Sequence, residues 1–248
     1  MMASERKSKV IVVLPAYNAA TTLIKTLEDI PVECVDEILL VDDASHDNTM
    51  ELAQKIEHGD VKINNHIPLK AFKHDKNRGY GGNQKTCYGL ALSRGADIVV
   101  MLHPDYQYDP RLVRYFVDFI DNDYFDVMLG SRIRTRKEAL AGGMPIYKYF
   151  FNRMLTLWEN FVSGQNLSEW HTGMRAYRRE VLESVDYNSN SNDFVFDTQM
   201  LFKIIKKGFR IGEIPVPVRY FPEASSINFK RSMEYGLRTV WESVKYLM

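Results

Sequence analysis

Short apolar runs alternate with longer amphipathic segments through the first half of the chain. The runs are rich in β-branched residues, which suits buried strands, and the segments between them repeat their apolar positions at helical spacing. Strands that alternate with helices form βαβ units, so the pattern predicts an α/β fold with a mostly parallel sheet flanked by helices. The expected strands are Lys9–Leu14, Glu37–Val41, Leu69–Lys73, Asp97–Leu102 and Asp126–Leu129, and the expected helices are Ala20–Asp29, Thr49–Glu57, Gly82–Ser93 and Pro110–Asp121.

The pattern changes after Gly130. A polar stretch that contains glycines, Ser131–Pro145, is typical of a mobile loop. No internal repeat or Pro/Gly-rich linker divides the chain, so we expect a single domain over residues 1–248. The elements expected in this half are the helix Ile146–Val162, the strand His171–Tyr177, a short helix from Arg178, the helix Phe194–Lys207, the strand Arg210–Tyr220 and the helix Phe229–Leu247.

Composition narrows the class of partner. Apolar residues make up 45% of the 248 residues and charged residues 26%, as in ordinary folded proteins, and 32 basic residues balance 32 acidic ones. A chain without net charge has no global basic field to hold a nucleic acid, so we expect no nucleic-acid partner. Cys34 and Cys87 follow no metal or disulfide pattern, and Val10–Leu14 is too short for a signal peptide. We expect a cytoplasmic protein, attached at most to a membrane surface.

Polar clusters follow each of the five expected strands. Because the carboxyl ends of parallel strands share one edge of a sheet, where ligands bind, one composite site explains them better than five polar loops. The clusters are Pro15–Asn18, Asp42–Ser45, Asn77–Gly82, His103–Asp105 and Ser131–Arg132.

The clusters favour some ligands over others. The backbone amides from Gly79 to Gly82 open a helix and can face an anion, but the motif is neither a dinucleotide fingerprint nor a P-loop, so we do not expect NAD. Asp42 and Asp43 can accept hydrogen bonds from a base or a ribose, or cap the turn locally. Ligand binding and local capping by these two carboxylates are compatible with each other.

A second set of residues suits a divalent cation. Asp105, with Gln107 and His103, offers the oxygen and nitrogen ligands of Mg²⁺ or Mn²⁺, although a turn rich in Asp and Pro looks the same. Arg132 can balance a phosphate charge in bidentate fashion, or be a solvated surface arginine.

Together these motifs resemble the family 2 glycosyltransferases of GT-A fold, and most of all the dolichol-phosphate mannose synthase and polyprenyl-phosphate glycosyltransferase group. The resemblance spans Val10 to Tyr220. It implies a Rossmann-like GT-A domain with a nucleotide-sugar half at about 9–132 and an acceptor half at about 133–248. The motifs are Val13–Asn18, Val41–Thr49, Asn77–Asn83, the turn His103–Asp105 and Thr172–Tyr177.

The resemblance also implies an activity: an inverting transferase that uses a UDP- or GDP-linked sugar, a divalent metal and a lipid-phosphate or sugar acceptor. Arg132 matches a basic residue near the diphosphate and sugar, and Gln107 matches a position on the metal side. The donor site implied in this way contains Pro15, Ala16 and Tyr17 against the base, Asp43 on the nucleoside, Gly79, and Asp105 as the metal carboxylate.

The chain departs from the family pattern at three places. Ala19 stands where a Glu is common, and His103 replaces the first Asp of the metal motif, which favours Mn²⁺ over Mg²⁺ because imidazole suits the harder ion poorly. Ser225–Ile227 lacks the Lys that lipid-phosphate enzymes often have there, and Lys230 or Arg231 is the candidate to replace it.

The acceptor determines whether a base is needed. A phosphate oxygen is already anionic, whereas a sugar hydroxyl must lose its proton to a carboxylate. The candidate base is Asp197, with Asp193 behind it, although an acidic residue in a first helical turn also has an ordinary capping role.

The expected helix Ile146–Val162 combines aromatic and basic residues, among them Phe150, Trp158, Lys148 and Arg153. Such a helix suits a membrane interface, and equally a core helix or a contact in a homo-oligomer. Two other functions remain open. A nucleotidyltransferase would need a Gly-rich first loop, which Pro15–Asn18 is not, and a non-catalytic nucleotide-sugar-binding protein would explain Ala19 and His103.

Overall fold

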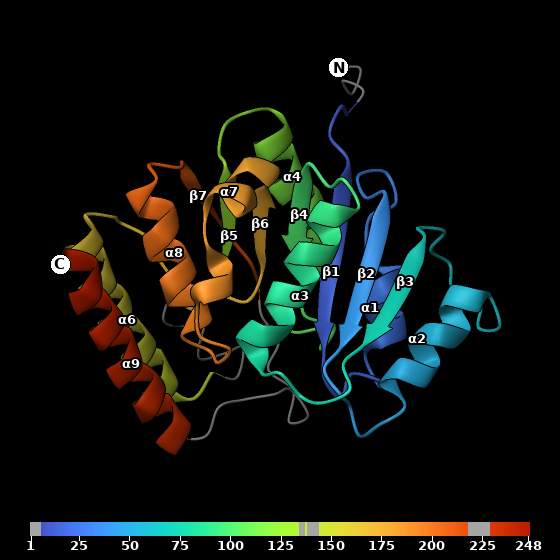
Figure 1. Cartoon of the computed structure of the whole chain (residues 1–248), viewed down its shortest axis with the longest axis horizontal. Coiled ribbons are helices and arrows are strands. Elements are labelled where there is room, and N and C mark those ends of the chain that lie inside the picture. The colour runs from blue at the N-terminus through green and yellow to red at the C-terminus, as the bar shows by residue number, and fades with distance from the viewer. Residues whose placement is uncertain (1–5, 134–136, 138–143, 218–228) are drawn as a thin grey trace.

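In the part of the chain that the structure describes, seven strands form one sheet in the order β3-β2-β1-β4-β6-β5-β7 (Figure 1). The computed structural model describes residues 6–133, 137, 144–217 and 229–248. β6 is antiparallel to its neighbours β4 and β5, and the other pairs are parallel, which confirms one mostly parallel α/β domain. The strands are β1 Val10–Ala16, β2 Glu37–Asp42, β3 Leu69–Lys73, β4 Ile98–Met101, β5 Val127–Ser131, β6 Arg175–Arg178 and β7 Ile211–Pro215.

Helices cover both faces of this sheet because alternate residues of the central strands point to opposite sides. Val10 and Val12 of β1 pack with α1, α2 and α4, whereas Ile11 and Val13 pack with α3, α7 and α8. The helices are α1 Leu23–Glu28, α2 Thr49–His58, α3 Tyr80–Ser93, α4 Val113–Asp121, α6 Ile146–Ser163, α7 Arg179–Ser184, α8 Phe196–Lys206 and α9 Phe229–Leu247, with 3₁₀ turns at Pro110–Leu112 and Tyr187–Ser189.

Most boundaries lie close to the predicted ones, with two corrections. The helix predicted from Ala20 begins at Leu23, because the carbonyl of Ala19 accepts hydrogen bonds from the amides of Thr22 and Leu23 in a preceding turn. The strand predicted from His171 begins at Arg175, because the amide of Gly173 leaves the sheet to bind the Tyr108 hydroxyl at 2.8 Å. Residues 134–136, 138–143 and 218–220 of the predicted loop and last strand, and 225–227, lie outside the described residues.

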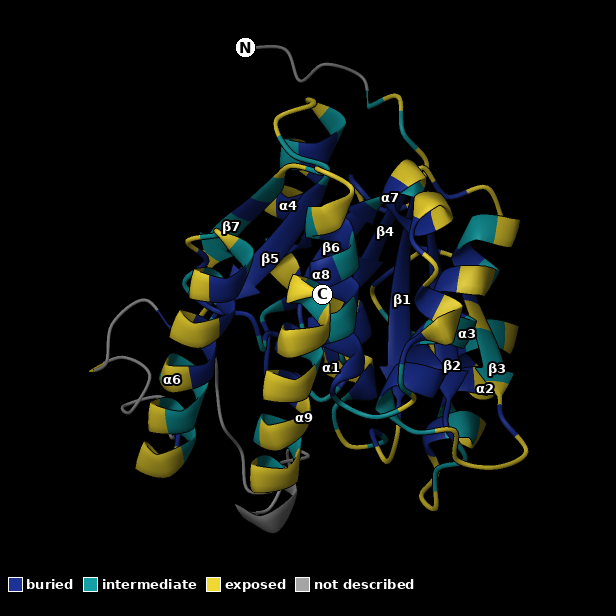
Figure 2. Ribbon diagram, turned by 60° about the vertical axis from the view of Figure 1, so that its left-hand side comes forward, coloured by how far each residue is buried: buried dark blue, intermediate teal, exposed yellow. Residues whose placement is uncertain are grey.

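The helices α6 and α9 form a pair at one side of the domain, and α9 also contacts α8 (Figures 1 and 2). A Cβ atom at Gly236 of α9 would lie 3.8 Å from Leu155 of α6. Polar residues are buried on these two helices: Thr156 and Glu159 on α6, and Thr239 and Ser243 on α9. Among the described helices, none has the length and apolar character to span a membrane.

Two glycines of α3 provide a test of this packing. A Cβ at Gly81 would lie 2.5 Å from the Ser191 carbonyl oxygen and 2.7 Å from Phe196 Cβ, whereas one at Gly89 would meet nothing within 4 Å. We expect Gly81→Ala to lower the free energy of unfolding by about 1–3 kcal/mol through overpacking. Gly89→Ala should raise it by about 0.4–1 kcal/mol, because alanine restricts the unfolded chain.

Urea denaturation of the two variants beside the wild type measures both effects. The packing of α3 against the 191–196 segment is contradicted if both alanines stabilise the protein equally.

Candidate functional site

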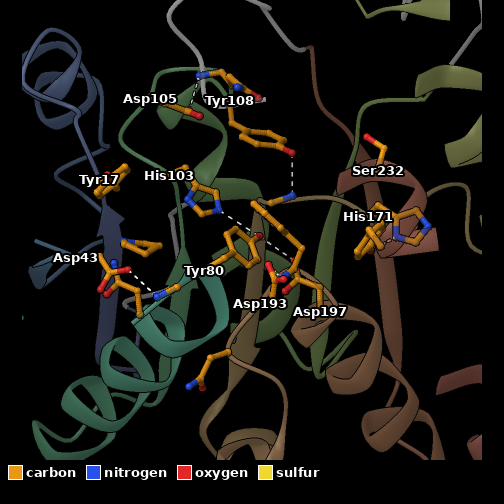
Figure 3. A pocket seen from close by; sticks show the side chains of 18 of the residues that line it. Tyr17, Asp43, Tyr80, His103, Asp105, Tyr108, His171, Asp193, Asp197 and Ser232 are labelled. Carbon is orange, nitrogen blue, oxygen red and sulfur yellow. Dashed lines mark hydrogen bonds between the residues drawn. The ribbon is translucent and has the colours of Figure 1, made fainter. Parts of the chain in front are cut away.

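A cavity of about 740 Å³ lies at the carboxyl edge of the parallel strands, and the turns after β1, β2, β3, β4 and β5 contribute to its lining (Figure 3). The structure therefore brings the polar clusters of the sequence together. Most of the residues named as donor, metal or catalytic candidates line this cavity: Pro15, Ala16, Tyr17, Asp43, Gly79, His103, Asp105, Gln107, Arg132, Asp193 and Asp197. Asp42, the other candidate for a base or a ribose, does not line it, because its side chain is buried and accepts a hydrogen bond from the Ser45 amide at 3.2 Å, which is the local capping role.

Asp43 organises one end of the cavity. Its carboxylate accepts hydrogen bonds from the amides of Arg78 at 2.8 Å and Gly79 at 3.0 Å, and lies 2.8 Å from Nδ1 of the buried His74. Gly79 is required here, since its φ is +82° and a Cβ would lie 2.6 Å from the Asn192 carbonyl oxygen. Two carboxylate oxygens can accept roughly four hydrogen bonds, so Asp43 retains capacity for a ligand donor.

Tyr17 lies beside Asp43 with 45% of its surface exposed. The turn that carries it is tied to the turn after β2: the amide of Asn18 donates to Ser45 Oγ at 2.9 Å, and the amide of His46 donates to Asn18 Oδ1 at 2.9 Å. An exposed aromatic ring on a fixed turn is suited to stacking on a flat ligand.

The turn after β4 presents the metal candidates. Asp105 Oδ1 accepts a hydrogen bond from the Gln107 amide at 3.0 Å, and the Pro104 carbonyl accepts one from Thr22 Oγ1 at 2.6 Å. Among the described residues, no group of three or more His, Cys, Asp or Glu side chains can hold a metal alone. Mg²⁺ and Mn²⁺ need fewer protein ligands where substrate phosphates supply the rest, so Asp105 fits that kind of site.

A row of hydrogen bonds crosses the middle of the cavity (Figure 3). His103 Nε2 lies 3.3 Å from the Tyr80 hydroxyl, which donates to Asp197 Oδ2 at 2.8 Å. Asp197 Oδ2 lies 3.5 Å from Nη2 of the fully buried Arg175. Burial, followed by the charge of Asp197, raises the pKa of Tyr80, so its hydroxyl keeps its proton.

Arg132 is held by a carboxylate that the sequence analysis did not single out. Glu169 accepts from the Arg132 amide at 2.7 Å and from Nε at 2.8 Å, and Asn152 Nδ2 donates to the same carboxylate at 3.0 Å. Burial alone would raise the pKa of Glu169, but the charge and hydrogen bonds of Arg132 outweigh it, and the pKa lies below its ordinary value.

The opposite end of the cavity is lined by α6 and α9. Lys148, Phe151 and Leu155 come from α6, and Ser232 and Tyr235 from α9. Burial, and then the charge of Arg132, lower the pKa of the Lys148 ammonium. The half-buried ammonium of Lys148 is a group that can bind an anion at this end of the cavity.

His171 connects this end to the helices. Its Nδ1 lies 2.6 Å from the Tyr235 hydroxyl and its Nε2 lies 3.0 Å from Oε2 of the buried Glu159. Sequence reasoning gave Tyr80 and Lys148 no role in this cavity, and it missed Glu169 and the partners of this histidine. Tyr80 lies in the predicted Gly-rich turn and Lys148 in the predicted aromatic helix, so the sequence position of each could have indicated a place near the site. Glu169 is an isolated acidic residue, and no pattern in the sequence pointed to it.

Comparison with known proteins gives one family and several relatives. The profile of glycosyl transferase family 2 matches residues 11–186. The UDP-N-acetylglucosamine–dolichyl-phosphate N-acetylglucosaminyltransferase of Methanococcus voltae is 27% identical, over 85% of this chain and 86% of its own length. The polyprenol monophosphomannose synthase of Mycolicibacterium smegmatis is 26% identical, over 84% of this chain and 76% of its own length.

Solved structures show the same fold. Glucosyl-3-phosphoglycerate synthase of Mycobacterium tuberculosis matches with a TM-score of 0.69 at 17% identity, over 97% of this chain and 81% of its own. Its complex with Mn²⁺, uridine diphosphate and glucosyl-3-phosphoglycerate matches with a TM-score of 0.68 at 16% identity, over 97% of this chain and 80% of its own. The expected GT-A fold is thereby confirmed.

The Arg132–Glu169 pair predicts a pH dependence of stability. A carboxyl whose pKa is lowered by folding stabilises the folded state above its unfolded pKa, about 4.3 for glutamate, and loses that effect as the pH falls through the folded value. At pH 7 we expect Glu169→Gln to lower the free energy of unfolding by about 3 kcal/mol, since it removes one partner of a buried pair.

The difference between Glu169→Gln and the wild type should shrink as the pH falls below about 4, because the unfolded wild-type chain gains a proton there before the folded carboxyl does. Denaturant unfolding from pH 3 to pH 7 measures this. A difference that stays constant over that range would show that the charge of Glu169 contributes nothing.

Proposed function

This chain belongs to glycosyl transferase family 2, and from that premise we propose that it transfers a sugar from a nucleotide-diphosphate sugar to a polyprenyl phosphate. The observation that supports this acceptor is the composition of the α6–α9 end of the cavity. There Arg132 and Lys148 lie in the same lining as the apolar Phe151 and Leu155. A lipid phosphate needs both, cations for its head and apolar surface for its chain.

The donor binds at the other end, in the half formed by residues of about 9–132. The exposed ring of Tyr17, with Pro15 and Ala16 beside it, packs on the base, and Asp43 accepts a hydrogen bond from the nucleoside. A uridine nucleotide is our first choice, because the relative from M. voltae is named for a UDP-linked sugar and the solved synthase was crystallised with uridine diphosphate.

A divalent cation belongs with the donor diphosphate, where it neutralises the charge that grows on the leaving group. Asp105 and His103 are the residues that would hold it, with Gln107 beside them. Because His103 supplies a nitrogen ligand, Mn²⁺ is favoured over Mg²⁺.

The acceptor phosphate attacks the anomeric carbon from the face opposite the nucleoside diphosphate, and the anomeric configuration inverts. Its oxygen is anionic and needs no base. The surroundings of Asp197 agree with this, since its carboxylate is paired with Arg175 and accepts the Tyr80 hydroxyl. A base at Asp197 belongs to the alternative in which a sugar hydroxyl is the acceptor.

The α6–α9 pair has an apolar outer surface that suits a membrane interface on the cytoplasmic side. The exposed apolar residues recur about every three or four positions, which puts them on one side of each helix. Figure 2 shows the exposed side of both helices turned away from the sheet. Exposed apolar residues on one side of two packed helices indicate a contact with a membrane or another protein. It is made of Tyr147, Phe150, Met154, Leu157, Trp158 and Phe161 on α6, and Met233, Leu237, Val240, Trp241, Val244 and Leu247 on α9.

A transfer assay tests the acceptor. The protein is incubated with Mn²⁺ and a radiolabelled donor, UDP-N-acetylglucosamine, UDP-glucose or GDP-mannose, together with undecaprenyl phosphate or 3-phosphoglycerate. We expect label in the organic phase with the lipid only, a loss of transfer in EDTA, and a loss of about 10²–10³-fold in Asp105→Asn.

Asp75→Asn, the same change at an exposed position outside the cavity lining, is the matched control and should transfer at the wild-type rate. Label on 3-phosphoglycerate alone would overturn the lipid acceptor. Donor binding without transfer to either acceptor would favour a non-catalytic binding protein.

Vesicle co-sedimentation tests the apolar surface. We expect the wild type to sediment with phosphatidylcholine–phosphatidylglycerol vesicles and the double variant Leu157→Gln/Leu237→Gln to bind at least about tenfold more weakly, since burying a leucine contributes about 1.5–3 kcal/mol. Val32→Gln, at a residue 56% exposed near α1, is the control and should bind as the wild type does.

Sedimentation equilibrium without vesicles gives the competing outcome. A homodimer that the double variant disrupts, together with no vesicle binding by the wild type, would assign the surface to a second copy of the chain.

A further inference from the structure

The Tyr80 hydroxyl bridges the metal candidate His103 and the carboxylate of Asp197. A carboxylate beside an arginine has no proton to donate, so Tyr80 is the donor in the 2.8 Å bond to Asp197. A hydroxyl has one hydrogen. Because the Tyr80 hydroxyl uses that hydrogen in its bond to Asp197, its oxygen can only accept a hydrogen bond from His103. The hydrogen in the 3.3 Å contact therefore lies on His103 Nε2.

The protonation of Nε2 determines the chemistry of the other ring nitrogen. A neutral imidazole carries a hydrogen on one nitrogen and a lone pair on the other, so Nδ1 of His103 has the lone pair. The two nitrogens point to different sides of the ring, and in Figure 3 the second nitrogen is drawn on the side of Tyr17, away from Tyr80.

The ring orientation of His103 is fixed from two directions. Its ring stacks on that of Tyr80, with centroids 5.3 Å apart and planes at 26°. On its Nε2 edge it meets Gly173, where a Cβ would lie 2.9 Å from Cδ2 and 3.2 Å from Nε2. The absence of a side chain at Gly173 therefore lets the ring occupy this position.

We propose that Tyr80 and Asp197 are positioning residues that hold His103 in its Nε2–H tautomer and turn the Nδ1 lone pair toward the donor diphosphate and its cation. A histidine that ligates a metal usually donates its other N–H in this way, which fixes tautomer and ring orientation. The assignment of a cation to this place rests on the proposed function, whereas the tautomer does not.

The first experiment uses the protein without ligands, so its outcome is independent of any transferase activity. Long-range ¹⁵N–¹H spectra of the imidazole rings, recorded at alkaline pH, distinguish the two neutral tautomers, and His103→Gln identifies the signals of His103. We expect Nε2 to be protonated in the wild type and both tautomers to be populated in Tyr80→Phe, which keeps the stacked ring and removes the hydroxyl. An Nδ1–H tautomer in the wild type overturns the proposal even if Tyr80→Phe does not fold.

The second experiment measures Mn²⁺ affinity by the electron paramagnetic resonance signal of free Mn²⁺, in the presence of uridine diphosphate. We expect Tyr80→Phe to weaken Mn²⁺ binding by about 10–100-fold, the usual effect of losing such a partner. Tyr115→Phe, at a tyrosine 49% exposed on α4, is the control and should match the wild type. Unchanged Mn²⁺ affinity in Tyr80→Phe, with the predicted wild-type tautomer, would overturn the positioning role and leave the proposed transfer reaction untouched.

Discussion

The arrangement of the site depends on one buried charge, the guanidinium of Arg175 on β6, which has no exposed surface. A buried charge is tolerated only with a counter-ion and hydrogen-bond acceptors. Arg175 Nε donates to the Thr172 carbonyl at 2.8 Å and Nη2 to the Trp170 carbonyl at 2.9 Å, and Asp197 supplies the opposite charge. These contacts fix the loop before β6 and the start of α8 against the centre of the sheet.

Both ends of the cavity depend on the contacts of Arg175. The loop before β6 carries Glu169, which holds Arg132, and on the other side of Arg175 the hydrogen bonds run through Asp197 and Tyr80 to His103. Arg132 at one end and His103 at the other are therefore connected through one ion pair. We therefore expect a change at the fully buried Arg175 to affect both ends of the cavity.

The strand ends could be predicted from the sequence because the carboxyl ends of parallel strands share an edge whatever their side chains are. That rule alone was sufficient to group Asp43, Asp105 and Arg132. The partners of these residues could not be predicted, since a tyrosine in a Gly-rich turn or a glutamate in a loop has no periodicity, and Tyr80 and Asp197 meet across 117 positions. The predicted start of β6 was wrong for a similar reason, because the hydrogen bond between Gly173 and Tyr108 is a tertiary contact that the local sequence does not reveal.

Periodicity predicted the helix α6 but not which of its faces is buried. Glu159 faces inward, where Thr198 Oγ1 donates to it at 3.1 Å, while Phe150 and Phe161 are exposed. A helix with polar residues inside and aromatic residues outside is unfavourable in water. Each Å² of apolar surface left exposed costs about 25 cal/mol, unless an apolar partner covers the outer face. A polyprenyl phosphate also has a polar part and an apolar part, an anionic head and an apolar chain. Because Lys148 and Phe151 line the cavity within two turns of the exposed Phe150 and Met154, a single helix serves both parts of the proposed acceptor.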